Sequence, residues 1–525
     1  MSRSVEAMTA RYGRAYPVGV IAMAIMSTMA AVLSGTIINV AIPDIMGSFG
    51  IDQVQAQWLA SGFLACMAVT MVMVDWSCRA VGQPVVMAGA AAAFLVFSIV
   101  GGLANSIEVL SLSRIVQGAA AGYLQPLSMI AVMQVFPPER RGTALGIYGV
   151  GAVLAPGMGP FFGGVLMDAF DWRYVFYAGA PLSAMSLLLV VLFMPQPDDQ
   201  RERTAFDWPG VVLMAVMILS TMTALTDGVR HGWHDESVVL RFTLGAACLG
   251  TFIWWELKTA TPLVDLHIFR SPAFAGAACV SVVLGAGLFG STYLLPLFAQ
   301  SVQGLTPTVS GGILLAGGIA MVFLTPLTGR LADRIQPGIQ IGFGMSLFAI
   351  SFILMAGAEL GTAALTLALW MMIGRIGMSF IFPALSAGGS RSLPPELLAQ
   401  GASTLSLLRQ LGGALGVSML AVLLEFRLGV HGAALADTQL PGRAVTETML
   451  DRVETLTEPA GLTTVEQSAV ALDFLSRTIE GQAFVRAFSD AFAMGGAVFA
   501  LAVAAAGLMT SRFGVRQPGR PATAG

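Results

Sequence analysis

Charge is scarce in this sequence. Only 11% of its 525 residues are Asp, Glu, Lys or Arg, and Lys258 is the single lysine. Soluble domains carry roughly 25% charged residues. A water-soluble globular protein is therefore excluded, and we expect most of the protein surface to contact lipid.

Signatures of catalysis and metal binding are also missing. The sequence contains no glycine-rich phosphate loop ending in Lys-Ser/Thr, no HExxH and no GxSxG. The four cysteines lie in or beside apolar runs without metal-ligand spacing, so we interpret them as buried thiols. We expect no enzyme, no cofactor, no metal site and no nucleic-acid partner.

Apolar residues are abundant instead, at 56% of the chain with a mean hydropathy of +0.78. Apolar runs of about 20 residues recur along its length, and each can cross a hydrocarbon layer roughly 30 Å thick. The pattern predicts an all-α polytopic membrane protein with fourteen spanning helices. They are expected near 17–42, 54–76, 82–104, 107–135, 142–168, 172–194, 207–228, 237–257, 272–298, 308–329, 338–358, 361–389, 399–425 and 485–510.

The basic residues predict the orientation. With a cytoplasmic N-terminus, sixteen Lys and Arg residues fall in inside segments, and only Arg173, Arg230 and Arg241 fall in short outside turns. Basic residues concentrate on the cytoplasmic side of membrane proteins. We therefore expect a multi-pass protein of the inner (plasma) membrane with both termini in the cytoplasm.

Two segments of the chain resemble each other. "QPLSMIAVMQVFPPE" and "FPALSAGGSRSLPPE" each close a predicted helix, and eight helices separate them. Three residues recur at a displacement of 257: Pro126 and Pro383, Pro137 and Pro394, Glu139 and Glu396. An even number of intervening helices predicts two halves in parallel orientation, a feature typical of transporters.

This repeat predicts the domain organisation. The expected parts are a cytoplasmic N-terminus (1–16), a six-helix bundle (17–194), a linker with two extra helices (195–271), a second six-helix bundle (272–510) and a cytoplasmic tail (511–525).

A long polar insertion, 426–484, precedes the last predicted helix. We interpret it as a periplasmic loop with a short helix on the membrane surface, since long loops are translocated largely regardless of charge. A docking site for a periplasmic adaptor protein is the alternative.

Six ordered motifs carry a family resemblance: "TIINVAIP" at 36–43, "LSRIVQGAAAG" at 112–122, "APGMGPFFGG" at 155–164, "WRYVF" at 172–176, "PLVDLHIF" at 262–269 and "GRLADR" at 329–334. Together they resemble the major facilitator superfamily, in its fourteen-span drug:proton antiporter branch of the EmrB/QacA type. The resemblance implies two six-helix bundles with alternating access. It also implies export of small hydrophobic or cationic compounds in exchange for protons.

The stretch from Gly149 to Gly164 holds six glycines and two prolines within an apolar run. Small residues let helix backbones approach closely in lipid, where helices gain little from hiding apolar surface. By resemblance this is the antiporter motif, whose glycine face closes against the opposite half. A packed helix crossing is compatible with that role. The motif residues are Pro156, Gly157, Gly159, Pro160, Gly163 and Gly164.

Three arginines lie within predicted spans, where charge is expensive and typically functional. By resemblance Arg114, with Gln117 and Gly118, acts in proton coupling; the alternative is an arginine that reaches to the outer interface. Arg375 and Arg409 lie deeper. They are candidates for the substrate cavity or for hydrogen bonds to backbone carbonyls.

The inner turn "GRLADR" contains Arg330, Asp333 and Arg334. The resemblance implies charge contacts there that hold the inside closed. A solvated turn that obeys the positive-inside pattern is the alternative.

The first helix departs from the family pattern Leu-Asp-x-Thr, because Ser34 stands in the position of the acid. A serine does not titrate near neutral pH. Ser34, Thr36 and Asn39 remain candidates for hydrogen bonds to a substrate.

The coupling proton then needs another acid. Asp168, Asp227 and Glu425 are the candidates, with an interfacial acid as the plain alternative for each. Two other functions stay open: an uncoupled or differently coupled exporter of the same fold, and a membrane sensor or assembly subunit that does not transport.

Overall fold

The computed structural model describes residues 3–195, 206–259, 262–332, 334–391, 393, 397–439, 444–457 and 463–509. Within these ranges the regular elements are helices, without strands. Fourteen helical segments are long and apolar enough to cross a membrane, which confirms the predicted number. The all-α fold expected from the apolar runs is confirmed as well.

The N-terminal helices follow a short helix α1 (Arg3–Tyr12). They are α2 (Ala15–Phe49), α3 (Gln53–Ala56), α4 (Trp58–Met71), α5 (Val74–Val81), α6 (Gln83–Gly102), α7 (Ile107–Val135), α8 (Pro138–Ala169), α9 (Arg173–Tyr177) and α10 (Gly179–Phe193). A hairpin follows, formed by α11 (Trp208–His231) and α12 (Glu236–Glu256), and then a 3-10 turn η1 (Leu266–Arg270).

The C-terminal helices are α13 (Pro272–Ser301), α14 (Pro307–Ala332), α15 (Pro337–Ala356), α16 (Ala364–Arg391), α17 (Leu398–Ala436), α18 (Ala444–Thr457) and α19 (Thr464–Leu508). Several helices begin at a proline, among them α8, α13, α14 and α15. Proline suits the first helical position, because its missing N–H would have no partner there and its φ angle is already helical.

The packing repeats between the two sets of helices. In the first set α2 packs on α8 and α10, α7 packs on α4 and α6, and α6 packs on α10. In the second set α13 packs on α17 and α19, α16 packs on α14 and α15, and α15 packs on α19. The sets meet through two equivalent pairs, α8 with α14 and α17 with α4. This pattern is what a duplicated bundle related by a pseudo-two-fold axis would produce.

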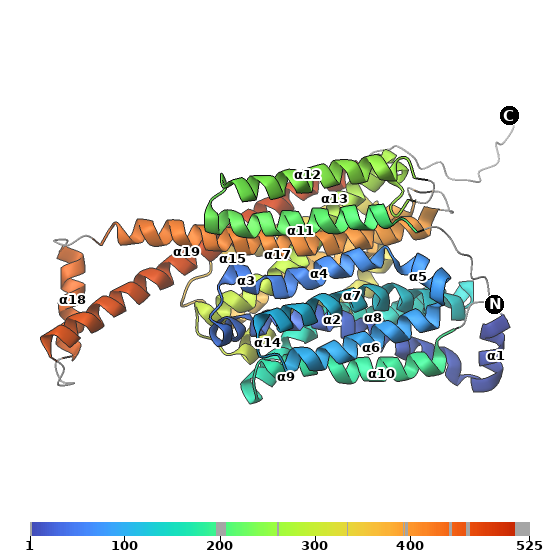
Figure 1. Cartoon of the computed structure of the whole chain (residues 1–525), viewed down its shortest axis with the longest axis horizontal. Coiled ribbons are helices and arrows are strands. Elements are labelled where there is room, and N and C mark those ends of the chain that lie inside the picture. The colour runs from blue at the N-terminus through green and yellow to red at the C-terminus, as the bar shows by residue number, and fades with distance from the viewer. Residues whose placement is uncertain are drawn as a thin grey trace.

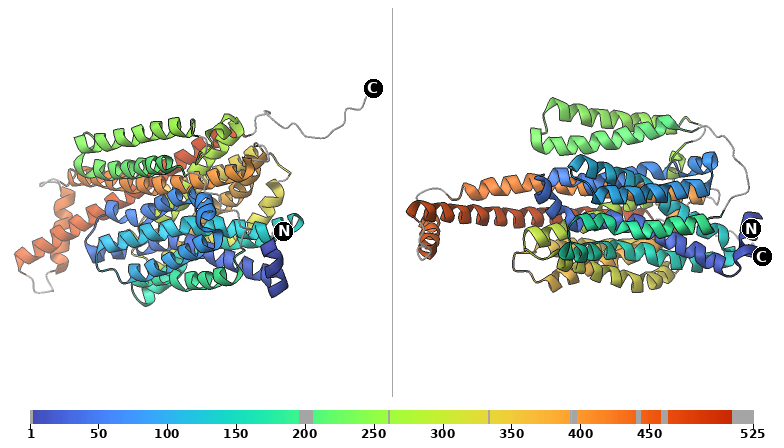
Figure 2. Two further views of the ribbon diagram at one scale, coloured as in Figure 1. Left: turned by 45° about the vertical axis from the view of Figure 1, so that its right-hand side comes forward. Right: turned by 60° about the horizontal axis from the view of Figure 1, so that its bottom comes forward.

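The long helices run side by side along one axis (Figure 1). Helices α1 and α5 lie at one end of the bundle, and α3, α9 and α18 lie at the other. Figure 2 shows the α11–α12 hairpin at the edge of the bundle, where α11 contacts α17 and α4. The ends that carry the predicted inside and outside turns are therefore separated by the length of the bundle.

The segment 426–484 differs from our prediction of a polar loop. Helix α17 continues to Ala436 and α19 already begins at Thr464, so both helices project beyond the bundle and α18 lies at the tip (Figures 1 and 2). A capping box between Thr463 and Glu466 starts α19. The prediction for this segment is one short helix, and nothing in the sequence indicates that α17 and α19 continue through it, because a helix surrounded by water needs no apolar stripe.

Asp490 ties the projecting helices together at their base through an ion pair with Arg427 and a hydrogen bond with His431. The Asp490 carboxylate of α19 accepts from Arg427 Nε at 2.5 Å and contacts His431 Nε2 at 2.7 Å, both on α17. The projection lies at the end of the bundle that carries α3 and α9 (Figure 1).

Some sequence predictions fall outside the described residues. They include the repeat residues Pro394 and Glu396 and the tail 511–525. Pro126 and Pro383, the first pair of the repeat, both lie inside helices, α7 and α16.

Candidate functional site

A buried arginine organises the core of the N-terminal helices. Arg114 of α7 is only 1% exposed, and its guanidinium donates hydrogen bonds to three helices. Nε donates to the Leu59 carbonyl at 2.8 Å, and one terminal nitrogen donates to the Ser34 carbonyl at 3.0 Å. The other terminal nitrogen donates to Ser34 Oγ at 3.0 Å and to Gln117 Oε1 at 3.1 Å.

The network continues to a fourth helix and is covered by an aromatic ring. Gln117 Nε2 donates to Ser98 Oγ of α6 at 3.0 Å. The Arg114 guanidinium carbon lies 4.3 Å from the centroid of the Phe63 ring, a cation–π geometry. Because each nitrogen has an acceptor, Arg114 has no free reach to the outer interface, and the interpretation as an interfacial arginine does not fit.

Gly118 lets α7 approach α4 at this level. A Cβ atom on Gly118 would collide with the carbonyl oxygen of Phe63. Close backbone contact brings the Arg114 guanidinium within reach of the neighbouring main-chain carbonyls. Ser34, Gln117 and Gly118 thus lie together with Arg114, although the sequence alone placed Ser34 only as a cavity candidate.

A second buried arginine lies among the C-terminal helices. Arg375 of α16 is 2% exposed, and its aliphatic stem packs against Gly317 of α14. Its NH2 nitrogen lies 3.4 Å from Ser291 Oγ and its NH1 nitrogen 3.5 Å from the Met378 sulfur. Both contacts are long, the thioether sulfur is a weak acceptor, and Nε has no hydrogen-bond partner.

Arg409 of α17 is half-buried, with its guanidinium carbon 5.5 Å from the centroid of the Phe382 ring. It lies apart from the Arg375 contacts just described. Thr36 is buried and donates to the Leu33 carbonyl of its own helix at 3.2 Å, which is a local structural contact. Neither residue joins the Arg114 network.

Asn39 bridges the two sets of helices. Its Nδ2 donates to Thr292 Oγ1 of α13 at 3.3 Å, and its Oδ1 is buried without a partner. Gln300 Nε2 of α13 donates to the Val40 carbonyl at 3.0 Å in the same region. Asn39 is therefore at the boundary between the halves. Its partner Thr292 follows directly after Ser291, the serine that contacts Arg375.

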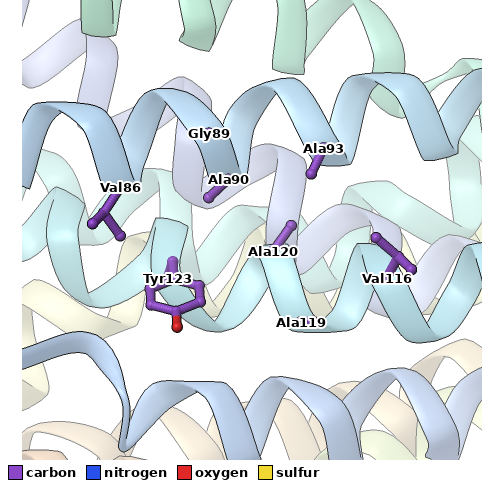
Figure 3. Close-up of a pocket in the computed structure, with 8 residues that line it drawn as sticks. All are labelled: Val86, Gly89, Ala90, Ala93, Val116, Ala119, Ala120 and Tyr123. Carbon is purple, nitrogen blue, oxygen red and sulfur yellow. The ribbon is translucent and has the colours of Figure 1, made fainter. Parts of the chain in front are cut away.

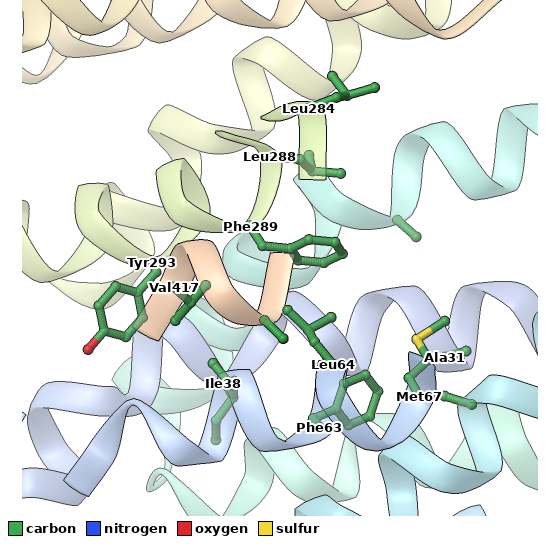
Figure 4. Close-up of a cluster of buried hydrophobic side chains, with 14 of the residues drawn as sticks. Ala31, Ile38, Phe63, Leu64, Met67, Leu284, Leu288, Phe289, Tyr293 and Val417 are labelled. Atoms are coloured by element: carbon green, nitrogen blue, oxygen red, sulfur yellow. The ribbon is translucent and has the colours of Figure 1, made fainter. Parts of the chain in front are cut away.

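The sequence analysis missed several polar residues at this boundary. Gln53 donates to the Tyr293 hydroxyl, and Gln57 Oε1 accepts from Ser418 Oγ of α17 at 2.9 Å. Glutamine and serine are common everywhere, so their types carried no signal without the tertiary contact. Around them an apolar cluster from α2, α4, α13 and α17 fills the interface, including Ile38, Phe63, Phe289 and Val417 (Figure 4).

The glycine-rich stretch lies between the halves. A Cβ atom on Gly157 would lie 2.9 Å from the Cα atom of Gly318 on α14, and one on Gly164 would collide with the Pro307 carbonyl oxygen. Pro156 and Pro160 are buried in the same helix. Helix α8 therefore meets α14 backbone to backbone over several turns.

The opposite face of the stretch packs within the first half. A Cβ atom on Gly159 would lie 3.0 Å from the Leu33 carbonyl oxygen, and one on Gly163 would lie 2.7 Å from the Ile37 side chain, both on α2. The glycines thus serve two interfaces, one on each side of α8.

The inner turn "GRLADR" is described only in part. Arg330 and Arg334 are exposed at the end of α14 and in the following turn, and Asp333 lies outside the described residues. The expected charge contacts of this turn stay a prediction.

The three candidate acids are dispersed. Asp168 Oδ2 accepts from the Thr308 backbone N–H of α14 at 3.1 Å, and Asp227 forms an ion pair with Arg241 within the α11–α12 hairpin. Glu425 is half-buried on α17 and lies close enough to Asp52 and Arg230 for electrostatic interaction. None of the three contacts Arg114 in the described part of the chain.

An apolar groove lies between α6 and α7, away from these polar groups. It is lined by small residues, among them Gly89, Ala90, Ala93 and Ala120, with Tyr123 at one end (Figure 3). Among the described residues no group of three or more His, Cys, Asp or Glu side chains could hold a metal ion.

Comparison with known families decides the identity. Residues 24–417 match the family model of the Major Facilitator Superfamily. The chain belongs to this superfamily. It is accordingly a multi-pass membrane transporter, and the resemblance seen in the six motifs is confirmed.

Relatives of comparable length include proteins named for drug export or for resistance. The Multidrug export protein EmrB of Escherichia coli (strain K12) is 28% identical over 482 residues, which cover 90% of this chain and 91% of EmrB. The Fatty acid resistance protein FarB of Neisseria gonorrhoeae is 28% identical over 477 residues, which cover 89% of this chain and 91% of FarB.

Solved structures of other transporters share the fold. A bacterial homolog of the human lysosomal transporter Spinster, crystallised in an inward-facing and unoccupied conformation, superposes with a TM-score of 0.60. The match covers 94% of this chain and 98% of that chain at 15% sequence identity. At this identity the likeness concerns the fold alone.

Proposed function

We propose that this facilitator exports small hydrophobic compounds by alternating access, in exchange for protons. The bundles 17–194 and 272–510 are the two moving units of this proposal, and the linker 195–271 joins them. The observation that carries it is the contact of α8 with α14, where Gly157 and Gly318 bring the two halves together backbone to backbone. An interface without bulky side chains lets two rigid bundles rock against each other.

The relatives support export as the direction of transport. EmrB is named as a multidrug export protein and FarB as a fatty acid resistance protein. The resemblance also implied cationic compounds, but two fully buried arginines and a third that is half-buried lie within the spans. Buried positive charge repels a cation in a low-dielectric interior, so hydrophobic compounds without positive charge are favoured.

Proton coupling needs a titratable group that responds to rocking. Glu425 is the best placed of the three candidate acids, because it is half-buried and forms no ion pair in the described part of the chain. Asp168 and Asp227 are already engaged, the first with a backbone N–H and the second with Arg241. In this proposal Arg114 couples protonation to the packing of α2, α4, α6 and α7.

One observation favours a second function, an exporter without proton coupling. The side-chain group of α2 that accepts from Arg114 is the hydroxyl of Ser34, at 3.0 Å, where the family pattern has a carboxylate. A hydroxyl cannot take up and release a proton near neutral pH.

Flux in proteoliposomes separates the two functions. Purified protein is reconstituted with a pH-sensitive dye inside the vesicles, and a fluorescent hydrophobic compound is supplied with and without an imposed pH gradient. Antiport predicts that the gradient drives transport and that each unit of substrate moves protons the other way. Transport that ignores the gradient would establish the uncoupled exporter, and no transport at all would contradict both.

We also propose the orientation and one partner surface. The excess of basic residues at the end with α1 and α5 supports cytoplasmic termini in the inner membrane. The projection formed by α17, α18 and α19 then extends into the periplasm, where it offers a surface for an adaptor protein.

A further inference from the structure

The positive charge of Arg375 is uncompensated. The side chain is 2% exposed within a spanning helix, and no carboxylate of the described residues pairs with it. One nitrogen has no partner, and the other two reach a serine hydroxyl at 3.4 Å and a thioether sulfur at 3.5 Å. A charged group inside the membrane normally finds an opposite charge or several strong acceptors.

Arg114 shows what a satisfied arginine looks like in the same fold. Its three nitrogens share four hydrogen bonds of 2.8–3.1 Å to two backbone carbonyls, a hydroxyl and an amide oxygen. Both arginines contact a serine, Ser34 and Ser291, and these serines are 257 residues apart, the same displacement as Pro126 and Pro383. The arginines themselves are 261 residues apart, about one helical turn off that displacement. The two sites therefore resemble each other without being equivalent positions, and only the N-terminal one is complete.

The missing acceptors at Arg375 match an anionic group. A carboxylate presents two oxygens that a guanidinium can bind side by side, and such charge-assisted bonds are about twice as strong as neutral ones. The stem of Arg375 is clamped against Gly317, where a Cβ would overlap it, so the guanidinium is held in place before the anion arrives.

The face of α13 that carries Ser291 is apolar in the turns before that serine. Leu284 and Leu288 lie seven and three residues before Ser291, on the same face of α13, and both are buried (Figure 4). Thr292, next to Ser291, contacts Asn39 across the boundary between the halves. The site thus lies where a substrate that alternates between the two sides would have to pass.

We propose that Arg375 binds the anionic headgroup of the exported compound, and that this compound is an amphiphile with one carboxylate and an apolar chain. The proposal rests on the export function inferred above and names its substrate class. The α13 face with Leu284 and Leu288 accommodates the chain, and the Ser291 hydroxyl donates a hydrogen bond to the carboxylate.

Three ten-carbon probes test the charge preference: decanoate, decyltrimethylammonium and decanol. Proteoliposomes carrying the full-length protein are expected to export decanoate faster than the other two. The Arg375→Gln variant is expected to lose decanoate export by at least about tenfold, the loss of one charge-assisted pair, and to keep any export of decanol. Arg375→Lys keeps the charge and should retain part of the decanoate export, and Arg79→Gln, which removes an exposed charge, serves as the control.

The outcomes distinguish this proposal from the export function. If no probe moves, export itself fails. If the cation or the alcohol moves and decanoate does not, export stands and the anion site is wrong. Equal loss of all probes in Arg375→Gln would also overturn it, because that pattern belongs to a purely structural arginine.

A binding measurement covers the case in which Arg375→Gln does not fold. Decanoate should raise the melting temperature of the purified wild-type protein more than decyltrimethylammonium does at equal concentration. The reverse order would contradict the proposal without any variant.

Discussion

At the scale of single residues, Arg114 is the side chain on which most of the N-terminal half converges. It joins α2, α4 and α7 directly and α6 through Gln117. A buried donor that loses its acceptor, or an acceptor that loses its donor, costs about 1–3 kcal/mol. The arrangement of these helices therefore depends on this one guanidinium.

The first prediction concerns its removal. Arg114→Ala leaves the Ser34 and Leu59 carbonyls without their donor, so we expect export to fall at least about tenfold, the equivalent of about 1.4 kcal/mol, while the protein still reaches the membrane. Flux per molecule of reconstituted protein, with the amount quantified on a blot, measures the effect. Wild-type flux in this variant would refute the role of Arg114.

The second prediction restores the family's acid. Ser34→Asp places a carboxylate where Arg114 now binds a hydroxyl at 3.0 Å, so a titratable ion pair replaces a neutral contact. We expect the number of protons moved per exported molecule to rise. Ser34→Asn introduces a side chain of the size of aspartate that does not titrate, so it should keep the wild-type ratio of protons to exported molecules. An equal ratio in Ser34→Asp and Ser34→Asn would contradict a coupling role for a carboxylate at position 34.

At the scale of elements, α8 owes its position to its glycines. The helix is packed between α2 of its own half and α14 of the other, and both contacts are too close for a β-carbon at Gly163 or Gly164. In lipid such van der Waals contact between backbones is a main source of helix association. The same contact is what rocking must break and remake.

The third prediction tests how the close contact of α8 with α14 affects both stability and transport. Gly164→Ala pushes a methyl group against the Pro307 carbonyl, and overpacking of this kind costs typically about 1–3 kcal/mol. We expect slower export and a lower melting temperature. Gly149→Ala in the same stretch meets no atom within 4 Å and provides the matched control, which should transport like the wild type. Similar behaviour of the two variants would show that the α8–α14 contact is unimportant.

At the scale of the whole molecule, the projection beyond the bundle distinguishes the two membrane sides. It lies at the end with α3 and α9, whereas α5 lies at the opposite end (Figure 1). Ala469 on α19 and Ala80 on α5 are exposed at opposite ends. A cysteine introduced at each position therefore lets a membrane-impermeant thiol reagent report the orientation.

The fourth prediction uses Ala469→Cys and Ala80→Cys. In right-side-out vesicles an impermeant maleimide should modify the cysteine at 469 and not the one at 80, and the pattern should reverse in inverted vesicles. Burial, with a smaller effect from Asp75, raises the pKa of the native Cys78 thiol to about 12, so this residue reacts slowly at neutral pH. The other native cysteines are replaced by serine, and labelling of both sites from one side would overturn the two-bundle arrangement.

Much of the fold could be predicted from the sequence. The fourteen spans follow from apolar runs whose length matches the bilayer, and α7 begins and ends where the run from 107 to 135 does. The repeat was visible in Pro126 and Pro383 because duplicated bundles keep their helix-breaking residues in register. Within 426–484 the sequence predicted one short helix but not the projection. Only the Asp490 contacts with Arg427 and His431 show that α17 and α19 run together.

The candidate site divides in the same way. Arg114 and Arg375 could be singled out because a charge within an apolar run is conspicuous by itself. The roles of Ser291 and Met378 could not, since serine and methionine are ordinary residues in any membrane helix. Only the packing of α13 against α16 shows that Ser291 and Met378 contact Arg375.

The sequence by itself determined what meets lipid, how many times the chain crosses it and which residues are too polar to be there without a reason. These properties depend on local composition, because each segment inserts into the bilayer according to its own length and hydrophobicity. The tertiary structure alone decided which arginine is satisfied and which is not. Hydrogen bonds from Arg114 to Ser34 and from Arg375 to Ser291 join residues 80 and 84 positions apart, and only the packing of separate helices brings such groups within 3–3.5 Å.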